Sequence, residues 1–512
     1  MSKKPTFVQK KLFYSLAFSL FFLFPLFLSL KNIIQGNIPF WFDNARDFLL
    51  ALGNLEKPTL IGPPTGIPGV FYGPYWIWLL SISLIFSKDP RFATILVSII
   101  PYFTLFPYLL WKLSKLLKNN SYLLIWPLFI FNYESYVTFL WNPHPAPLIF
   151  LMLIYLTITV FSQKKNKALK MMLVGLTAGF LTNFHMSFGI GTTGTIFLYF
   201  IINAFISLKG VVNVKRAFLK ACFDLGALML GVFVAFLPFF IFEIRHGFNQ
   251  IKAIGHTIIM STLYNSAVVG QIGLKKPEII YQFFKPLNQV FKMPKHFSYF
   301  IVLTIIVFVY YQLKKQNISF IKIEKKLLCL LFLFTFGIFC LFLSSKNPVW
   351  TYHFIGFEMI VLILIALIAS KFKYLKFGLL CWSIILVLSN FVKIIESPIT
   401  NPLTLSSLST KKHITEKIYQ DANQDSFAVF TYSSAIYTYD YDYLFTWLGE
   451  DKYSCQPEKE QSEAKFIYLI IPQTKKAILQ DFINYKTPNK NYETVKEWKI
   501  PDGTIIVKRK QI

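Results

Sequence analysis

Apolar runs about as long as a bilayer is thick recur along this chain and constrain its fold more than any other feature. About 20 helical residues are needed to cross roughly 30 Å of hydrocarbon. Eleven candidate spans lie at residues 12–30, 92–111, 121–133, 147–162, 171–184, 187–207, 221–242, 297–313, 327–344, 352–370 and 375–393. Only 15% of the 512 residues are charged, against about 25% in soluble proteins. The sequence therefore predicts a polytopic α-helical membrane protein.

The formal net charge of +27 could indicate nucleic-acid binding, but the placement of the charge argues against it. If the N-terminus is cytoplasmic, alternate segments between the spans contain 23 basic residues and one acid, Glu324. This is the positive-inside pattern of multi-pass proteins. We therefore expect no nucleic-acid partner, and we expect a plasma (inner) membrane protein with a cytoplasmic N-terminus, in contact with membrane lipid.

The segment "YGPYWIWLLSISLIF" (residues 72–86) tests this topology, because it is apolar enough to be counted as a span. Counting it would place the basic residues that follow outside and would invert every later loop. The segment is also short. We interpret it as a helix lying at the outer interface, with its Trp and Tyr side chains at headgroup depth. Eleven spans and an extracytoplasmic C-terminus follow from this interpretation.

After Lys393 the composition becomes polar, which divides the chain into a membrane domain (1–393) and an extracytoplasmic domain (394–512). "SFAVFTYSS" and "KFIYLIIP" are typical of strands, and "TKKAILQDFINY" of an amphipathic helix. "WKIPDGTIIVKRK" predicts a hairpin around Asp502 and Gly503. The acidic stretch "YTYDYDYLF" is interpreted as an exposed strand edge or loop. Together these patterns predict a small α/β domain.

The stretch "FWFDNARDFLLALGNL" (residues 40–55) places Asp43, Arg46 and Asp47 just outside the first span. Ionisable side chains at such a position are candidates for function. The alternative is structural: Asp43 suits the N-cap of a short interfacial helix, and Arg46 would pair with one of the carboxylates. The residues alone leave both interpretations open.

"FDNARDFLLA", followed by "GPPTGIPGVFYGPYWIWLL", resembles the start of bacterial membrane glycosyltransferases of the dolichyl-phosphate-mannose protein mannosyltransferase class, or glycosyltransferase family 39. The lipid A aminoarabinose transferases are more distant relatives. The resemblance implies a GT-C fold, in which the first outer loop, here about 31–91, contains an acidic motif and interfacial helices. It covers residues 1–400 as architecture, but only this loop is specific. Asn44 stands where the commonest pattern has a second acid.

The resemblance implies an inverting glycosyltransferase that moves a hexosyl or pentosyl group from a polyprenyl-phosphate donor. The acceptor is a lipid, glycan or protein on the outer face. Asp43 and Asp47 are the catalytic candidates, with Asp43 as the general base and Asp47 orienting Arg46 or the acceptor. General-base catalysis contributes roughly 10²–10⁴-fold. The chain has no nucleotide-binding loop, and a lipid-linked donor needs none.

The departing lipid phosphate needs positive charge where its negative charge develops. Arg46, Arg245 and His246 are the candidate phosphate ligands, because an arginine can donate two hydrogen bonds to phosphate. Further polar side chains at the outer face are expected to line the site: Glu134, His144, His185, Glu243 and His353. No cofactor is certain. A divalent metal ion between Asp43 and Glu134 or a histidine is left open, because sequence spacing does not test it.

Two other functions compete with this one. A polysaccharide polymerase or ligase would also act on lipid-linked glycans, and it predicts a dominant outer loop in the second half, which 243–296 partly provides. It does not explain the acidic first loop. A lipid or solute transporter predicts broken helices, charges in mid-membrane and repeated halves. The ionisable residues instead gather near the outer surface, and no internal repeat is found.

Overall fold

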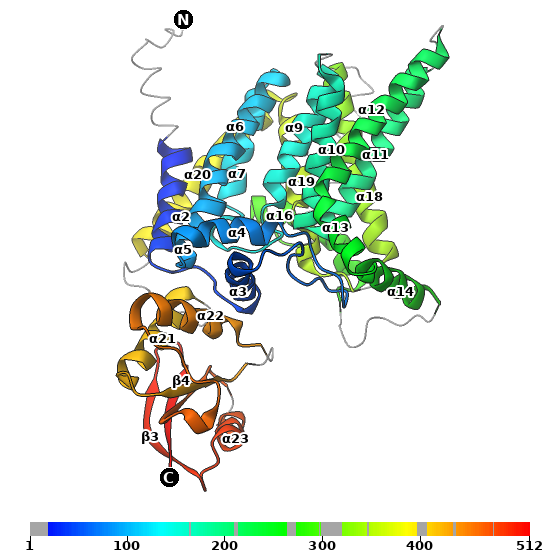
Figure 1. Cartoon of the computed structure of the whole chain (residues 1–512). Coiled ribbons are helices and arrows are strands. Elements are labelled where there is room, and N and C mark those ends of the chain that lie inside the picture. The colour runs from blue at the N-terminus through cyan, green and yellow to red at the C-terminus, as the bar shows by residue number, and fades with distance from the viewer. Residues whose placement is uncertain are drawn as a thin grey trace, which may run out of the picture.

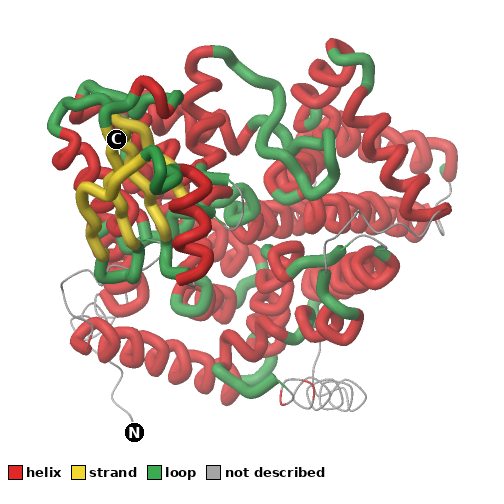
Figure 2. Tube along the Cα trace, turned by 90° about the horizontal axis from the view of Figure 1, so that it is seen from below, coloured by secondary structure: helices red, strands yellow, loops and turns green. Residues whose placement is uncertain are grey.

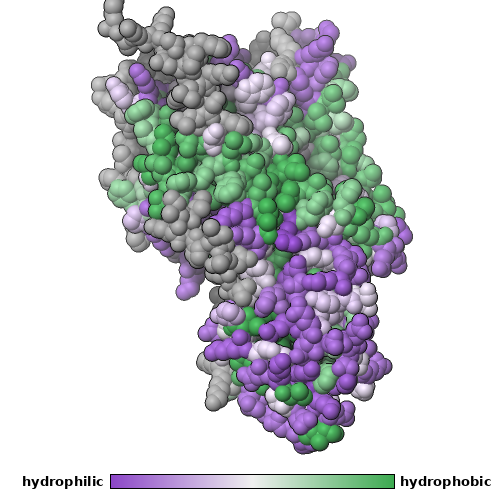
Figure 3. All heavy atoms as spheres, turned by 90° about the vertical axis from the view of Figure 1, so that its left-hand side faces the viewer, coloured by the Kyte–Doolittle hydropathy of each residue, from purple (hydrophilic) through white to green (hydrophobic). Residues whose placement is uncertain are grey.

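The structure is a computed structural model that describes residues 19–512 except 163–164, 209–212, 264–272, 296, 298, 300–319, 346–347, 397–406, 434–436 and 475. Long helices form a bundle, and a smaller domain that contains the strands lies beyond one end of it (Figure 1). On the face shown in Figure 3, apolar side chains form a band across the bundle, and polar ones dominate the surface of the smaller domain. The distribution is that of a helical membrane protein with a polar domain outside the bilayer.

Helices of very different lengths build the bundle. The longer ones are α6 (Ile100–Leu116), α9 (Ala146–Ser162), α10 (Lys167–Phe184), α11 (Met186–Leu208), α12 (Val214–Ala235), α18 (Lys322–Ser344), α19 (Phe357–Ala369) and α20 (Lys373–Glu396). The shorter ones are η1 (Ser19–Leu23), α2 (Phe24–Ile34), α5 (Pro90–Thr94), η2 (Ile95–Ile99), η3 (Asn120–Leu124), α7 (Ile125–Ile130) and α13 (Leu237–Arg245). α5, η2 and α6 follow one another without a break and together form one long helix.

Within the described residues, six helices are long and apolar enough to cross a membrane: Pro90–Leu116, Met186–Leu208, Val214–Ala235, Lys322–Ser344, Thr351–Ala369 and Lys373–Val392. Three other expected spans coincide with shorter apolar helices, at Ser19–Ile34, Asn120–Ile130 and Ala146–Ser162. The expected span 297–313 falls almost wholly outside the described residues. A multi-helix membrane protein is supported in this way, and the count of eleven spans stays a prediction.

One end of the bundle is covered by short helices and loops. These elements are α3 (Phe42–Glu56), α4 (Tyr75–Phe86), α8 (Ser135–Thr138), α14 (Asn249–Leu263), α15 (Lys276–Gln282), α16 (Lys285–Phe291) and η4 (Thr351–Phe354). α4 runs across this end of the bundle (Figure 1), and its 12 residues extend only about 18 Å. It folds back on α3, where the Ser81 hydroxyl donates a hydrogen bond to the Ala51 carbonyl. α4 is thus a short apolar helix, as the sequence predicts, and its place at the membrane interface stays a prediction.

The C-terminal domain is a four-stranded sheet with helices packed on it. Its strands are β1 (Phe427–Thr431), β2 (Phe466–Ile471), β3 (Tyr492–Lys499) and β4 (Ile505–Gln511), in the order β1-β2-β4-β3. Its helices are α21 (Leu408–Ala422), α22 (Tyr439–Leu448), η5 (Gly449–Tyr453), η6 (Gln461–Glu463) and α23 (Lys476–Lys486). β1 is parallel to β2, and β4 is antiparallel to both of its neighbours. The strands lie together over one side of the bundle end (Figure 2).

The strands, the amphipathic helix and the hairpin that the sequence predicts here are all found as β1, β2, α23 and the β3–β4 pair. Gly503 adopts φ +89° in the hairpin turn, a conformation that glycine tolerates at no steric cost. The interpretation of "YTYDYDYLF" as a strand edge or loop is wrong for all but its first two residues, because α22 begins at Tyr439. Tyr441 and Tyr443 of this stretch are buried, and Tyr443 packs against the rings of Phe40 and Phe48, whereas Tyr437 is 53% exposed.

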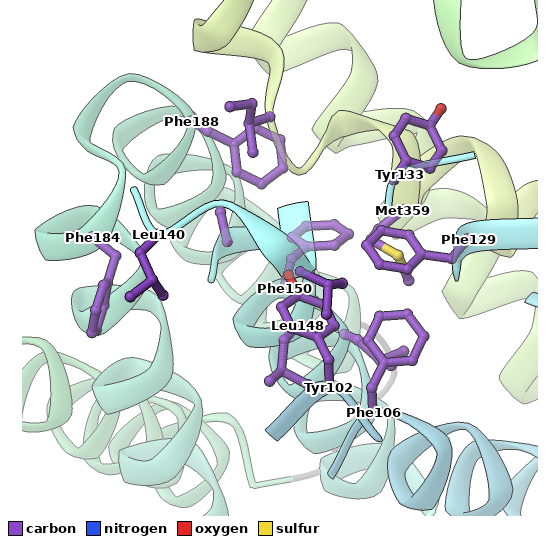
Figure 4. Packing of buried hydrophobic residues seen from close by; sticks show 14 of the residues in the cluster. Tyr102, Phe106, Phe129, Tyr133, Leu140, Leu148, Phe150, Phe184, Phe188 and Met359 are labelled. Carbon is purple, nitrogen blue, oxygen red and sulfur yellow. The ribbon is translucent and has the colours of Figure 1, made fainter. Parts of the chain in front are cut away.

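An aromatic core fixes the bundle next to the covered end (Figure 4). Phe129 stacks on Tyr102 and Phe106, with ring centroids 5.7 and 4.8 Å apart. The Tyr102 hydroxyl also donates a 2.6 Å hydrogen bond to the carbonyl of His144, in the loop before α9. The packed helices thereby hold the loop that faces α3.

Candidate functional site

The start of α3 is fixed by Asn44. Its Oδ1 accepts a hydrogen bond from the Trp41 backbone N–H at 2.8 Å, and its Nδ2 donates to the Pro39 carbonyl at 3.2 Å. This is the reciprocal half of a capping box, in which the third helical residue satisfies the N–H of the residue before the helix. Asp43 lies within the first turn and is not the N-cap. The capping interpretation of Asp43 is therefore wrong, and its carboxylate has another environment.

Arg46 joins the two carboxylates of α3 into one cluster. Its Nη1 donates to Asp43 Oδ1 at 2.8 Å, while its Nε and Nη2 both donate to Asp47 Oδ1, at 3.0 and 2.7 Å. The side chains of Asp43, Arg46 and Asp47 are 24%, 17% and 0% exposed. Three of the five guanidinium N–H groups donate within this cluster, and the other two have no acceptor among the described residues. The structure thus brings together the first three predicted site residues.

Asp47 is the buried member of this cluster. Its second oxygen, Oδ2, accepts a 2.8 Å hydrogen bond from the indole Nε1 of Trp76 on α4. Burial raises the pKa of Asp47 to about 6, although Arg46 and Trp76 both favour the charged form. With both oxygens occupied and no exposure, Asp47 is built to position its neighbours.

Asp43 has a more open environment. Burial also raises the pKa of Asp43, and Arg46 opposes this shift. Arg46 holds Oδ1, whereas Oδ2 accepts no hydrogen bond from the residues that the structure describes. Asp43 is therefore the carboxylate that an incoming molecule can reach.

Trp76 also forms a wall of a cavity of about 470 Å³ between α4, α6, α9 and α10. Its lining is almost entirely apolar and includes Phe139, Trp141 and His144 from the loop before α9. The Trp41 ring packs edge-on against Phe139, with centroids 4.9 Å apart. The carboxylate cluster and the apolar cavity are consequently adjacent, separated by a single indole.

A second cavity of about 240 Å³ lies at the same end of the bundle, where α11 begins and α18 ends. It is lined by Tyr72, Tyr352 and His353, among others. Tyr352 packs against Trp141 of the first cavity, with ring centroids 5.3 Å apart. Burial raises the pKa of Tyr72, and the charges of Arg46 and Asp47 act on it in opposite directions. The cluster therefore lies within electrostatic reach of the second cavity too.

Arg245, His246 and Glu243 lie at the end of α13. Arg245 and His246 are exposed. The His246 ring stacks on the Phe242 ring one turn earlier, with the ring centroids 4.0 Å apart. Glu243 is buried and accepts hydrogen bonds from two backbone N–H groups at the start of α14. Glu243 thus shapes the turn into α14. No contact between described residues joins Arg245 to Asp43.

The remaining predicted residues have varied environments. Glu134 accepts a 3.0 Å hydrogen bond from the Asn32 side chain. The buried His144 forms a 2.7 Å hydrogen bond with the Phe139 carbonyl and lines the 470 Å³ cavity. His185 is fully buried at the junction of α10 and α11. Only His144 among these residues lines the cavity shared with Trp76.

His353 accepts a 3.2 Å hydrogen bond from the Trp350 backbone N–H and lines the 240 Å³ cavity. The metal ion that the sequence left open would need several such ligands in one place. Within the part of the chain that is described, no group of three or more His, Cys, Asp or Glu side chains could hold a metal ion.

Sequence reasoning missed the contributions of Trp76 and of the C-terminal domain. Trp76 is buried beside Asp47. The domain covers α3 through Tyr443, whose ring packs on Phe48. It also binds the chain outside α3: Lys411 donates a 2.6 Å hydrogen bond to the Phe40 carbonyl, and the Tyr443 hydroxyl donates one of 2.5 Å to the Lys88 carbonyl. The many Tyr and Trp residues of the chain gave no signal that distinguishes these from the others.

No protein-family model matches this chain, and no curated protein matches it significantly.

Proposed function

We propose that this protein transfers a sugar from a polyprenyl-phosphate donor to an acceptor at the α3 end of the bundle. The observation that supports this most strongly is the single indole, Trp76, that separates a half-open carboxylate cluster from a 470 Å³ apolar cavity. A lipid-linked sugar has the matching composition, with a hydrocarbon tail and a polar reacting head. The cavity suits the first prenyl units of the tail, and the cluster suits the head.

Asp43 acts as the general base in this proposal. It takes the proton from the acceptor hydroxyl or amine as the acceptor atom bonds to the anomeric carbon from the face opposite the phosphate. The bond between that carbon and the phosphate oxygen breaks, and its electron pair leaves with the phosphate, so the configuration inverts. A carboxylate with a raised pKa takes a proton more readily near neutral pH, which fits the partly buried position of Asp43.

Arg46 and Asp47 position this base. Arg46 donates to one oxygen of Asp43, while Asp47 accepts from the guanidinium on its buried side and is itself held by the Trp76 indole. The other two N–H groups of Arg46 have no acceptor in the described part of the chain and can donate to the departing phosphate. If both carboxylates are ionised the cluster has a net charge of −1, so a further cation is needed there, and Arg245 and His246 remain the proposed sources.

The test is transfer of radiolabelled sugar from polyprenyl phosphates in membranes that contain the full-length protein. Asp43→Asn should lower transfer by at least about 100-fold, the lower range for general-base catalysis, with protein level and donor binding maintained. Asp425→Asn is the matched control, because its carboxylate pairs only with the surface residue Lys465 of the C-terminal domain among the described ion pairs. Near wild-type transfer by Asp43→Asn would refute the assignment.

A further inference from the structure

A third cavity, of about 480 Å³, lies at the end of the bundle away from α3. It is enclosed by the last turns of α9 and α11 and by the first turns of α10, α12 and α18, and α12 begins at that end (Figure 1). Its lining combines apolar side chains with a polar group made up of Lys167, Asn203, Ser207, Lys220, Asp224 and Lys326. The cavity has no part in the site proposed above.

The charges in this cavity do not cancel. Asp224 is buried and pairs with Lys167 at 2.5 Å. Lys220 and Lys326 also line the cavity, and neither belongs to an ion pair among the described residues. The Lys326 ammonium lies 3.7 Å from the centroid of the Phe161 ring, where a cation–π interaction holds it at the wall. A net charge of +2 is therefore concentrated in a partly enclosed space.

The surroundings of the cavity indicate where an anion would come from. α11 and α12, which form two of its walls, present large apolar side chains outward next to it: Phe205 and Phe223 are 65% and 68% exposed. In a chain of this composition such faces contact lipid acyl chains. A ligand that enters between these helices would thus have a negative head for the lysines and a hydrocarbon tail for the outer faces of α11 and α12.

We propose that this cavity binds the phosphate headgroup of an anionic phospholipid, with Lys220 and Lys326 as its cationic ligands. Basic pockets between membrane helices bind anionic headgroups on the cytoplasmic side, and the positive-inside pattern predicts that this end is cytoplasmic. Asp224 neutralises Lys167 and so limits the strength of the site. The proposal is independent of sugar transfer and of the residues at the α3 end.

The test measures binding of fluorescent phosphatidylglycerol to the purified full-length protein in neutral detergent micelles, with fluorescent phosphatidylcholine as the uncharged comparison. A lysine near an anionic lipid surface contributes roughly 5-fold in affinity. The double variant Lys220→Gln/Lys326→Gln should therefore bind phosphatidylglycerol about 25-fold more weakly, with phosphatidylcholine binding unchanged. The matched control is Lys373→Gln/Lys376→Gln, which removes the same charge from the start of α20 and should change binding less than about 3-fold.

A variant that binds the lipid more tightly distinguishes an effect of charge from an effect of misfolding. Asp224→Asn releases Lys167 and should tighten phosphatidylglycerol binding by roughly 5-fold, which a misfolded protein would not do. Inorganic phosphate at millimolar concentration should not displace the lipid. Equal losses in the two double variants, weaker binding by Asp224→Asn, or displacement by inorganic phosphate would each overturn the proposal.

Discussion

Replacing Trp76 by Phe should make the stability of this protein depend more strongly on pH. The substitution keeps a buried ring but removes the N–H that donates to Asp47 Oδ2 at 2.8 Å. Burial raises the pKa of Asp47 from 3.8 to about 6, so the folded protein binds this proton more tightly than the unfolded chain does. The stability from the protonated carboxyl is complete below about pH 4, and it is lost as the pH rises through 6.

The magnitude follows from the bond that is deleted. A hydrogen bond to a charged group contributes about 1.5–3 kcal/mol, and it favours only the ionised form of Asp47. Its loss should raise the pKa of Asp47 by a further 1–2 units or so, to between about 7 and 8. The free energy of unfolding of Trp76→Phe, relative to wild type, should consequently be about 1.5–3 kcal/mol lower at pH 8.5 than at pH 5. The packing cost of the smaller ring is equal at both pH values and cancels.

The assay is equilibrium unfolding in mixed detergent micelles, followed by circular dichroism. Trp78→Phe is the matched control: Trp78 lies on the same helix, but its Nε1 donates to the neutral Thr59 carbonyl at 2.9 Å. Its cost should be the same at both pH values. If Trp76→Phe also costs the same at pH 5 and pH 8.5, the indole does not stabilise an ionised Asp47, and the reasoning fails.

Three further outcomes are expected. If Arg245 binds the donor phosphate, Arg245→Ala should weaken donor binding and transfer together by roughly 10- to 150-fold, the equivalent of one charge-assisted hydrogen bond. Arg245→Lys should restore transfer per folded molecule only in part, and full restoration would indicate that Arg245 is an interfacial anchor. A reporter fused after Lys393 should be active outside the cytoplasm and one near Lys118 inside, and a cytoplasmic Lys393 fusion would contradict the predicted topology. Tyr443→Ala should weaken the packing of the C-terminal domain against α3 by about 3–5 kcal/mol, so that limited proteolysis releases this domain faster. Tyr443→Phe should have a much smaller effect.

Local features of the site could be predicted from the sequence because they depend on spacing within one element. Residues three apart share a helix face, so an Arg46–Asp43 pair follows once 42–56 is helical. The sequence suggests Asp43 as the N-cap because Asp is a favoured N-cap residue, whereas in the structure Trp41 is the N-cap and Asn44, the third helical residue, satisfies its N–H.

Features formed between elements could not be predicted in this way. The bond from Trp76 to Asp47 depends on the angle at which α4 folds back on α3, which the 57–74 loop sets. α22 was missed because its Tyr-Asp alternation has the period of a strand, whereas its tyrosines and leucines pack on several sides at once, against α21 as well as α3. A helix whose side chains are covered on several sides has no single polar face, and such a face is what makes a helix recognisable in a sequence.

The contact between α3 and the C-terminal domain can form only late in the synthesis of this protein. The Leu408 N–H donates to the Ile38 carbonyl, and Lys411 reaches Phe40, which lies 371 positions earlier in the chain. At 5–20 residues per second a ribosome needs roughly 20 to 75 seconds to make what lies between them. For that interval α22 does not exist, so the side of α3 that it covers in the structure is open. The candidate site is therefore finished only after the last domain has been made and has docked, and a chain that ends before α21 has the cluster without its cover.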